Sequence, residues 1–303
     1  MQDQRIFPNI WCNGNAEEAG EFYAAAIPRT VSVVEARYPS EGLLDFQRDM
    51  AGKALTVAVT IGDTLVRLIN AGPEFRPNPS ISFILNFDPL DFGGDVAAAR
   101  ASLDVTWAAL SAGGEVLMPL GEYPFSAHYG WVQDRYGVSW QLMLTKPEGD
   151  PRPFVVPSLL FSGAAQNRAA EAIDRYVALL GPDAAAGHRF PYGAATGPAT
   201  PEAIMFGEFR VGDQWISAMD SGVEMDAPFT NGVSLQVNCA DQAEIDRLWD
   251  ALSAVPEAEQ CGWLVDPFGV SWQIVPANMG ELMQRPNAYE HMMGMKKLVI
   301  ADF

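Results

Sequence analysis

The sequence predicts an α+β protein made of two tandem copies of one domain, each built from two βαβββ modules. Three observations support this prediction. Short blocks of sequence recur in one order in both halves, strand-like and helix-like segments alternate, and a proline- and glycine-rich segment separates the halves. A chain of 303 residues is also long enough for two domains of ordinary size.

The repeat is clearest near the end of each half, where GWVQDRYGVSWQ (130–141) matches GWLVDPFGVSWQ (262–273). Further blocks match in the same order: 8–14 with 157–163, 62–66 with 212–216, 82–86 with 234–238, and 107–112 with 249–254. The predicted organisation is a first domain (1–146), a linker (147–156), a second domain (157–277) and a C-terminal helical tail (278–303).

In the first module, residues 6–13 form a β-type run, and Asn15 is placed to cap a helix over 16–27. Extended runs follow at 31–37, 55–61 and 64–69, with Gly62-Asp63 as a hairpin turn between the last two. A second module has a strand at 81–86, a helix over 96–110, and strands near 115–117, 131–133 and 139–144. The second half repeats both modules but is shorter between its matching blocks, so two cavities of different shape are expected.

Two βαβββ modules per domain, Ala-x-x-Phe-Tyr in the first helix (19–23) and Asp-x-x-Gly before the last strand resemble the vicinal oxygen chelate superfamily. Segments 231–249, 260–264 and 292–298 look like its PhnB-like branch, which carries the label 3-demethylubiquinone-9 3-methyltransferase. The resemblance implies tandem glyoxalase/bleomycin-resistance/dioxygenase-like domains over nearly the whole chain. It is less specific for function, because the superfamily includes lyases, isomerases, oxygenases and drug-sequestering proteins.

The methyltransferase label does not agree with the sequence. A Rossmann-type S-adenosylmethionine site needs a glycine-rich turn after a parallel strand and an acid for the ribose. Gly93-Gly94 and Gly113-Gly114 flank a predicted helix, and no G-x-G-x-x-G occurs. We therefore do not expect methyl transfer.

The resemblance also implies a divalent metal on the concave face of the sheet. By motif, its ligand positions fall on Pro8 and Pro157 in the first strands, near Ser80 and Gly232 in the strands that open the next modules, and on the final-strand glutamines at 141 and 273. Proline has no ligating side chain and an amide carries no charge, so neither a cofactor nor a tightly held metal is expected. None of the three histidines falls at these positions.

Strand alternation places Gln141 and Gln273 on one face of the last strand of each half, and Trp140 and Trp272 on the other. Because helices cover one face of such a sheet, the tryptophans should pack beneath them and the glutamines should point into the concave cavity. There each amide either binds a ligand or hydrogen-bonds only water and neighbouring strands. The candidate cavity residues are Gln141, Gln273, Ser139, Ser271, Trp131, Trp263 and Cys12.

Several of these residues have a structural alternative. Trp131 and Trp263 are either cavity walls or core. Cys12 shares the strand face of Pro8 and would border the first cavity, unless it is a buried, inert thiol. Asp134 and Asp266 are expected to hold the turn before the last strand. The methionines of the tail have helical spacing and favour a docking helix.

A net charge of −19 argues against binding nucleic acid or an anionic membrane, and it favours a cationic ligand. Three widely spaced cysteines without a CxxC motif, and no apolar segment of spanning length, predict a cytoplasmic protein. The favoured function is binding of a small organic molecule without a tightly bound metal. The alternative is a weakly metal-dependent lyase, isomerase or dioxygenase of glyoxalase type. The second copy can also serve as a built-in dimer partner, and self-association stays open.

Overall fold

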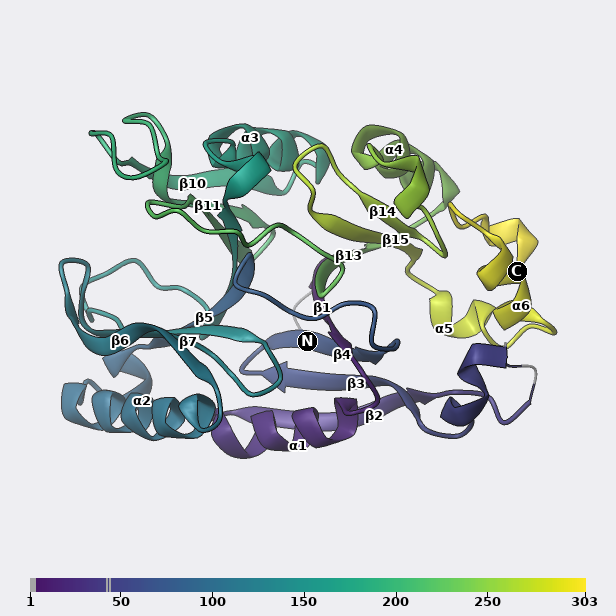
Figure 1. Cartoon of the computed structure of the whole chain (residues 1–303), viewed down its shortest axis with the longest axis horizontal. Coiled ribbons are helices and arrows are strands. Elements are labelled where there is room, and N and C mark those ends of the chain that lie inside the picture. Colours follow the sequence, from purple (N-terminus) through teal and green to yellow (C-terminus); the bar gives the residue numbers. More distant parts are fainter. Residues whose placement is uncertain (1–3, 42, 44) are drawn as a thin grey trace.

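The computed structural model describes residues 4–303 apart from Gly42 and Leu44. Two strongly curved sheets lie side by side, with α1 and α2 along one side of the molecule and α3 and α4 along the opposite side (Figure 1). This arrangement confirms the predicted α+β class. The longer helices are α1 (Ala16–Ala26), α2 (Val96–Ser111), α3 (Ala169–Leu179) and α4 (Gln242–Leu252).

The first sheet has seven strands in the order β14-β15-β13-β1-β4-β3-β2, and the second has eight in the order β10-β11-β12-β9-β5-β8-β7-β6. The strands of the first sheet are β1 (Ile6–Cys12), β2 (Thr30–Arg37), β3 (Ala54–Ile61), β4 (Thr64–Asn70), β13 (Val233–Cys239), β14 (Trp263–Val265) and β15 (Ser271–Pro276). Those of the second are β5 (Ile81–Phe87), β6 (Glu115–Tyr123), β7 (Ser126–Gln133), β8 (Ser139–Leu144), β9 (Val155–Phe161), β10 (Ala184–Pro191), β11 (Ile204–Val211) and β12 (Gln214–Asp220).

Each sheet combines one module from each half of the chain. Strand β1 of the first module pairs antiparallel with β13 of the fourth, and Asn9 lies opposite Ser234. Strand β5 of the second module pairs in the same way with β9 of the third, and Ser82 lies opposite Ser158. The two copies of the repeat therefore do not form one sheet each, because the hydrogen bonds that complete each sheet cross from one half to the other.

The helix-facing core joins modules within a half. The ring of Trp140 on β8 lies 5.2 Å from that of Tyr23 on α1, and the ring of Trp272 on β15 lies 5.2 Å from that of Tyr176 on α3. Both indoles are completely buried, as the strand alternation predicts. Side-chain packing thus holds each half together, while strand pairing joins the two halves.

The expected aspartates hold the turns before the last strands. In the first half, Asp134 accepts hydrogen bonds from the backbone N–H groups of Tyr136 (2.8 Å) and Val138 (3.1 Å) and from Nε1 of Trp140 (2.8 Å). Asp266 makes the same three contacts in the second half and also accepts from the Tyr176 hydroxyl at 2.6 Å. Burial raises the pKa of both carboxyl groups.

Two local predictions need correction. Asn15 does not cap α1 with its side chain; Oδ1 of Asn70, at the end of β4, accepts from the N–H of Ala16 at 3.0 Å instead. The third module has the same contact, in which Oδ1 of Asp220 accepts from the N–H of Ala169 at 3.1 Å. Strands β6 and β7 are also longer than predicted and form a hairpin whose turn carries the exposed Phe125.

The fourth module is shorter than the other three. Between α4 and β14 its described residues contain a short 3-10 helix, η4 (Pro256–Ala258), where the other modules have a full strand. The tail takes part of that place: the N–H groups of Cys261 and Gly262 donate to the carbonyls of Met295 (2.8 Å) and Lys296 (2.7 Å). Four βαβββ modules were predicted, but the last has one strand fewer, because the segment after α4 is short and contains proline.

The tail contains α5 (Met279–Leu282) and α6 (Ala288–Gly294). Its buried side chains Leu282, Ala288 and Leu298 form a second apolar core with Val275 of β15, to which the tail methionines also contribute. The tail therefore packs against the rest of the protein, at the right of Figure 1. No helix in the described part of the chain is long and apolar enough to cross a bilayer.

Candidate functional site

The concave face of the second sheet brings together three of the predicted residues. Nε1 of Trp131 donates to Oγ of Ser139 at 2.6 Å. Gln141 donates from Nε2 to Oγ of Ser82 at 2.8 Å and accepts at Oε1 from the Tyr129 hydroxyl at 2.7 Å. The amide thus lies on the predicted face, but the neighbouring strands use its hydrogen-bonding capacity.

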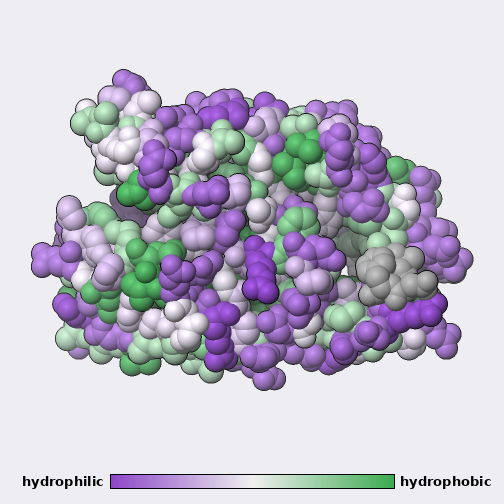
Figure 2. Space-filling model, in the orientation of Figure 1, coloured by the Kyte–Doolittle hydropathy of each residue, from purple (hydrophilic) through white to green (hydrophobic). Residues whose placement is uncertain are grey.

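An apolar cluster extends over this face beside Gln141. Tyr129, Trp131 and Leu160 form its buried part, and side chains from several strands and loops pack on them, namely Leu117, Met118, Tyr123, Met143, Met219 and Met225. We call this set the methionine groove. At one end lies a pocket of about 260 Å³, lined among others by Met143, Phe190 and Phe206. The surface is hollowed between the lobes carrying β10–β11 and β6–β7, at the left of Figure 2.

The floor of the second sheet carries two buried hydroxyl groups without a partner. Ser158 pairs with Ser82 on one side and with Ser217 on the other, so all three side chains share the concave face. Oγ of Ser158 and Oγ of Ser217 form no hydrogen bond with any described residue. Buried polar atoms are rarely left without a partner, so these two hydroxyls are positions for water or a ligand.

The first sheet has a comparable but covered concave face. Gln273 donates to Oγ of Ser234 at 2.9 Å, and Oγ of Ser271 has no partner among the described residues. Trp263 meets Trp11 edge to face, with ring centroids 5.8 Å apart. The tail covers one side of this face through its contacts with Val275 and reaches the opposite rim, where the Tyr289 hydroxyl donates to Gln47 at 2.9 Å. Access to this face is therefore more restricted than access to the methionine groove.

The positions that the superfamily uses for metal do not suit a metal in this chain. Pro8 and Pro157 face the helices, opposite Leu235 and Phe83, so the expected first-strand positions were wrong by one residue. The donors on the concave faces include Asn9, Arg67, Ser234 and Gln273 in the first sheet and Ser82, Gln141, Ser158, Ser217 and Glu208 in the second. The buried Glu208 carboxylate already forms an ion pair with Arg152 at 2.8 Å.

Neutral hydroxyls and amides are weak ligands, and the first set contains a cation. Nε of Arg67 lies 2.8 Å from the Glu35 carboxylate, its ion-pair partner. Within the described residues, no group of three or more His, Cys, Asp or Glu is arranged to hold a metal ion. The residues of both faces therefore do not fit a tightly bound divalent ion.

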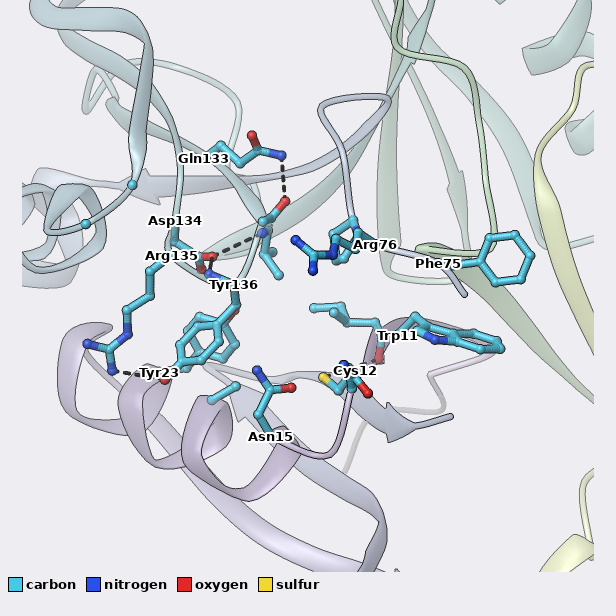
Figure 3. Close-up of a pocket in the computed structure, with 18 of the residues that line it drawn as sticks. Trp11, Cys12, Asn15, Tyr23, Phe75, Arg76, Gln133, Asp134, Arg135 and Tyr136 are labelled. Atoms are coloured by element: carbon cyan, nitrogen blue, oxygen red, sulfur yellow. Dashed lines mark hydrogen bonds between the residues drawn. The ribbon is translucent and has the colours of Figure 1, made fainter. Parts of the chain in front are cut away.

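Of the two interpretations of Cys12, the position on the concave cavity is wrong, and the buried thiol agrees with the structure. It shares the strand face of Pro8, but that face points to the helices, and Cys12 belongs to the main hydrophobic core. Burial, with a smaller contribution from the nearby Asp134 carboxylate, raises its pKa to about 12, so the thiol stays protonated at neutral pH. Cys12 borders instead a separate cleft between β1, α1 and the turn before β8 (Figure 3).

Ser82, Ser158 and Ser217 were not among the residues predicted from the sequence. A signal was present, because one matching block places a serine at the same position of both halves, Ser82 with Ser234, and another aligns Ser158 with the polar Asn9. Which strands of different modules lie side by side is not encoded in that pattern.

Comparison with known families agrees with this fold. The family model described as 3-demethylubiquinone-9 3-methyltransferase matches residues 4–143 and again residues 153–275. The chain therefore belongs to this family, the PhnB-like branch of the vicinal oxygen chelate superfamily, and holds two tandem copies of its domain.

Solved structures show the same similarity. The PhnB protein from Bacillus cereus is 29% identical, with 48% of this chain and 100% of that chain covered and a TM-score of 0.38. Protein PA1353 from Pseudomonas aeruginosa is 23% identical, with coverage of 47% and 98% and a TM-score of 0.36. Glyoxalase I from Zea mays is 13% identical, with coverage of 92% and 94% and a TM-score of 0.55, so it shares the fold over almost the whole length. None of the curated proteins compared with the chain matches it.

Proposed function

We propose that the protein binds a small, largely apolar organic molecule in the methionine groove, without a tightly bound metal. The observation that carries this proposal is a groove of aromatic and methionine side chains over two buried, unpartnered serine hydroxyls. Apolar walls with a few polar groups are typical of small-molecule sites, and flexible methionines adapt to ligands of different shape.

A cationic group on the ligand is favoured by the aromatic rings near the groove. Phe125 lies 4.9 Å from Tyr129 and 5.7 Å from Tyr123 between ring centroids, and it is 57% exposed. Faces of such rings attract cations, and the net charge of −19 acts in the same direction.

Metal-dependent chemistry of the glyoxalase or dioxygenase type gains no support from the donor sets on the two concave faces. The methyltransferase description of the family likewise finds no glycine-rich turn in this sequence. We therefore propose a binding function.

A matched series of naphthyl probes tests the proposal: naphthylmethyl-trimethylammonium, naphthylmethanol and naphthylacetate, titrated by calorimetry with and without a chelator. We expect the ammonium probe to bind tightest and the carboxylate weakest, with no effect of the chelator. Phe125→Ala should weaken the ammonium probe about two- to fivefold, the value of one partly exposed cation–π contact.

Val105→Ala, at a 71% exposed position on α2, is the matched surface control and should change nothing. Met219→Trp should block the groove and reduce binding of all three probes. The proposal fails if no probe binds to the wild type, or if binding persists unchanged in Met219→Trp.

A further inference from the structure

A further cavity lies in the first half of the chain, at the end of β1. It has a volume of about 610 Å³ and is enclosed by the end of β1, the start of α1, residues 75–77, and the loops at 113–115 and 133–138 (Figure 3). We call it the first-half cleft. Its size is within the usual range of small-molecule sites.

The second half has aromatic rings at the corresponding place. Cys12 pairs with Asn70 at the end of β1, and Phe161 pairs with Asp220 at the equivalent end of β9. The ring of Phe161 packs 5.1 Å from Phe229 and 6.0 Å from Phe268. A small thiol in the first half thus stands where the second half has a phenylalanine packed between two others.

Arg76 brings a positive charge to the rim of the cleft. The guanidinium of Arg76 points into the cleft (Figure 3), and its side chain forms no hydrogen bond or ion pair with the described part of the chain. The first half thus combines this hollow with the Arg76 guanidinium, whereas in the second half Phe161, Phe229 and Phe268 pack together at the corresponding strand end.

The other charged groups of the cleft limit the charge of a ligand. Asp134 is occupied by the backbone and by Trp140, and the guanidinium carbon of Arg135 lies over the Phe22 ring at 4.3 Å. Glu115 lines the cleft as a second acid. Two arginines, Arg76 and Arg135, stand against these two acids, so the cleft has no large excess of positive charge and suits a ligand with a single negative charge better than a multiply charged anion.

Asn15 supplies a hydrogen-bond acceptor to the cleft, whereas Arg76 supplies donors. Its side chain points into the cleft (Figure 3), is not used to cap α1, and its Oδ1 is buried without a partner. An amide oxygen accepts hydrogen bonds, so a ligand that satisfies it must carry an N–H or O–H group.

We propose that the first-half cleft binds a small organic monocarboxylate that also carries a hydroxyl or amino group. Arg76 would bind the carboxylate and Asn15 would accept from the donor. The site lies at the end of β1 and shares no lining residue with the methionine groove.

Three probes separate these contributions in ligand-observed NMR titrations at millimolar concentration: mandelate, its neutral amide, and phenylacetate, which lacks the hydroxyl. We expect mandelate to bind about tenfold more tightly than mandelamide, as expected for a charge-assisted hydrogen bond, and more tightly than phenylacetate. Arg76→Ala should weaken mandelate by a similar factor and leave mandelamide unchanged.

Arg100→Ala is the matched control, because Arg100 is exposed on α2 and its side chain also has no partner among the described residues. Cys12→Phe should fill the cleft and abolish mandelate binding, because Phe161 occupies the matching position in the second half. If this core substitution prevents folding, Arg76→Ala still tests the proposal, because Arg76 is exposed. The proposal is overturned if mandelate does not bind or binds no better than its amide, or if Arg76→Ala behaves like Arg100→Ala. Binding of the naphthyl ammonium probe should be the same in Arg76→Ala as in the wild type, so this test and that of the groove can fail separately.

Discussion

The two glutamines of the repeat occupy matching positions but differ in what they contact. Gln141 joins a buried tyrosine hydroxyl to a serine, whereas Gln273 donates only to Ser234. Strand alternation correctly placed both side chains opposite the buried tryptophans. It could not show the extra partner, because Tyr129 comes from a neighbouring strand whose register depends on a hairpin turn.

This difference predicts unequal effects on stability. Gln141→Ala leaves the buried Tyr129 hydroxyl without its acceptor and should lower the free energy of unfolding by about 1–3 kcal/mol. Gln273→Ala should cost less, because only a serine hydroxyl loses its partner. Urea denaturation of both variants measures this, and an equal or larger loss for Gln273→Ala would contradict the assignment.

At the scale of elements, the C-terminal tail compensates for the strand that the fourth module lacks. Methionines at helical spacing predicted a docking or core helix, and the shortened second half predicted two cavities of different shape. The sequence could not show that these two features meet, because hydrogen bonds between Cys261 and Met295 join segments with no shared local pattern.

A substitution at Leu298 tests whether the tail contributes to the stability of the folded protein. It is completely buried and packs in the second apolar core, so Leu298→Ala should destabilise the protein by about 2–5 kcal/mol through lost contacts and a cavity. The exposed Val105→Ala provides the control for a change of aliphatic side chain on the surface. A thermal unfolding midpoint for Leu298→Ala equal to that of the control would show that the tail is not part of the cooperative core.

At the scale of the whole molecule, the four modules were predictable and their pairing was not. Block repeats identify βαβββ units, but nothing in the repeat shows which other module pairs its first strand with β1. The pairing of β1 with β13 is therefore set by tertiary packing and not by a local pattern. The position of Cys12 has a simpler cause, because the face of β1 was assigned one residue out and Cys12 shares the helix-facing side with Pro8.

Cutting the chain tests this exchange. If residues 1–149 and 150–303 are produced together as separate polypeptides, they should assemble one to one, because β1–β13 and β5–β9 then become contacts between two chains. Affinity capture through a tag on one piece, followed by measurement of the mass of the complex, gives the stoichiometry. Two pieces that elute as independent folded monomers would be incompatible with the sheet order described above.

Pairing the first module with the last also has a consequence in time. Strand β13 begins at Val233, long after β4 ends at Asn70, so a ribosome adding about 5–20 residues per second finishes the partner of β1 roughly 8–30 seconds after the first module is complete. During that interval β1 is an open sheet edge that other nascent chains could extend. Pro8, in the middle of β1, does not weaken this edge: Trp11 donates to the carbonyl of Gly232 at 3.0 Å, so strand alternation turns the position without an N–H toward β4. The edge that waits for β13 therefore keeps its full set of backbone donors while the chain is still being made.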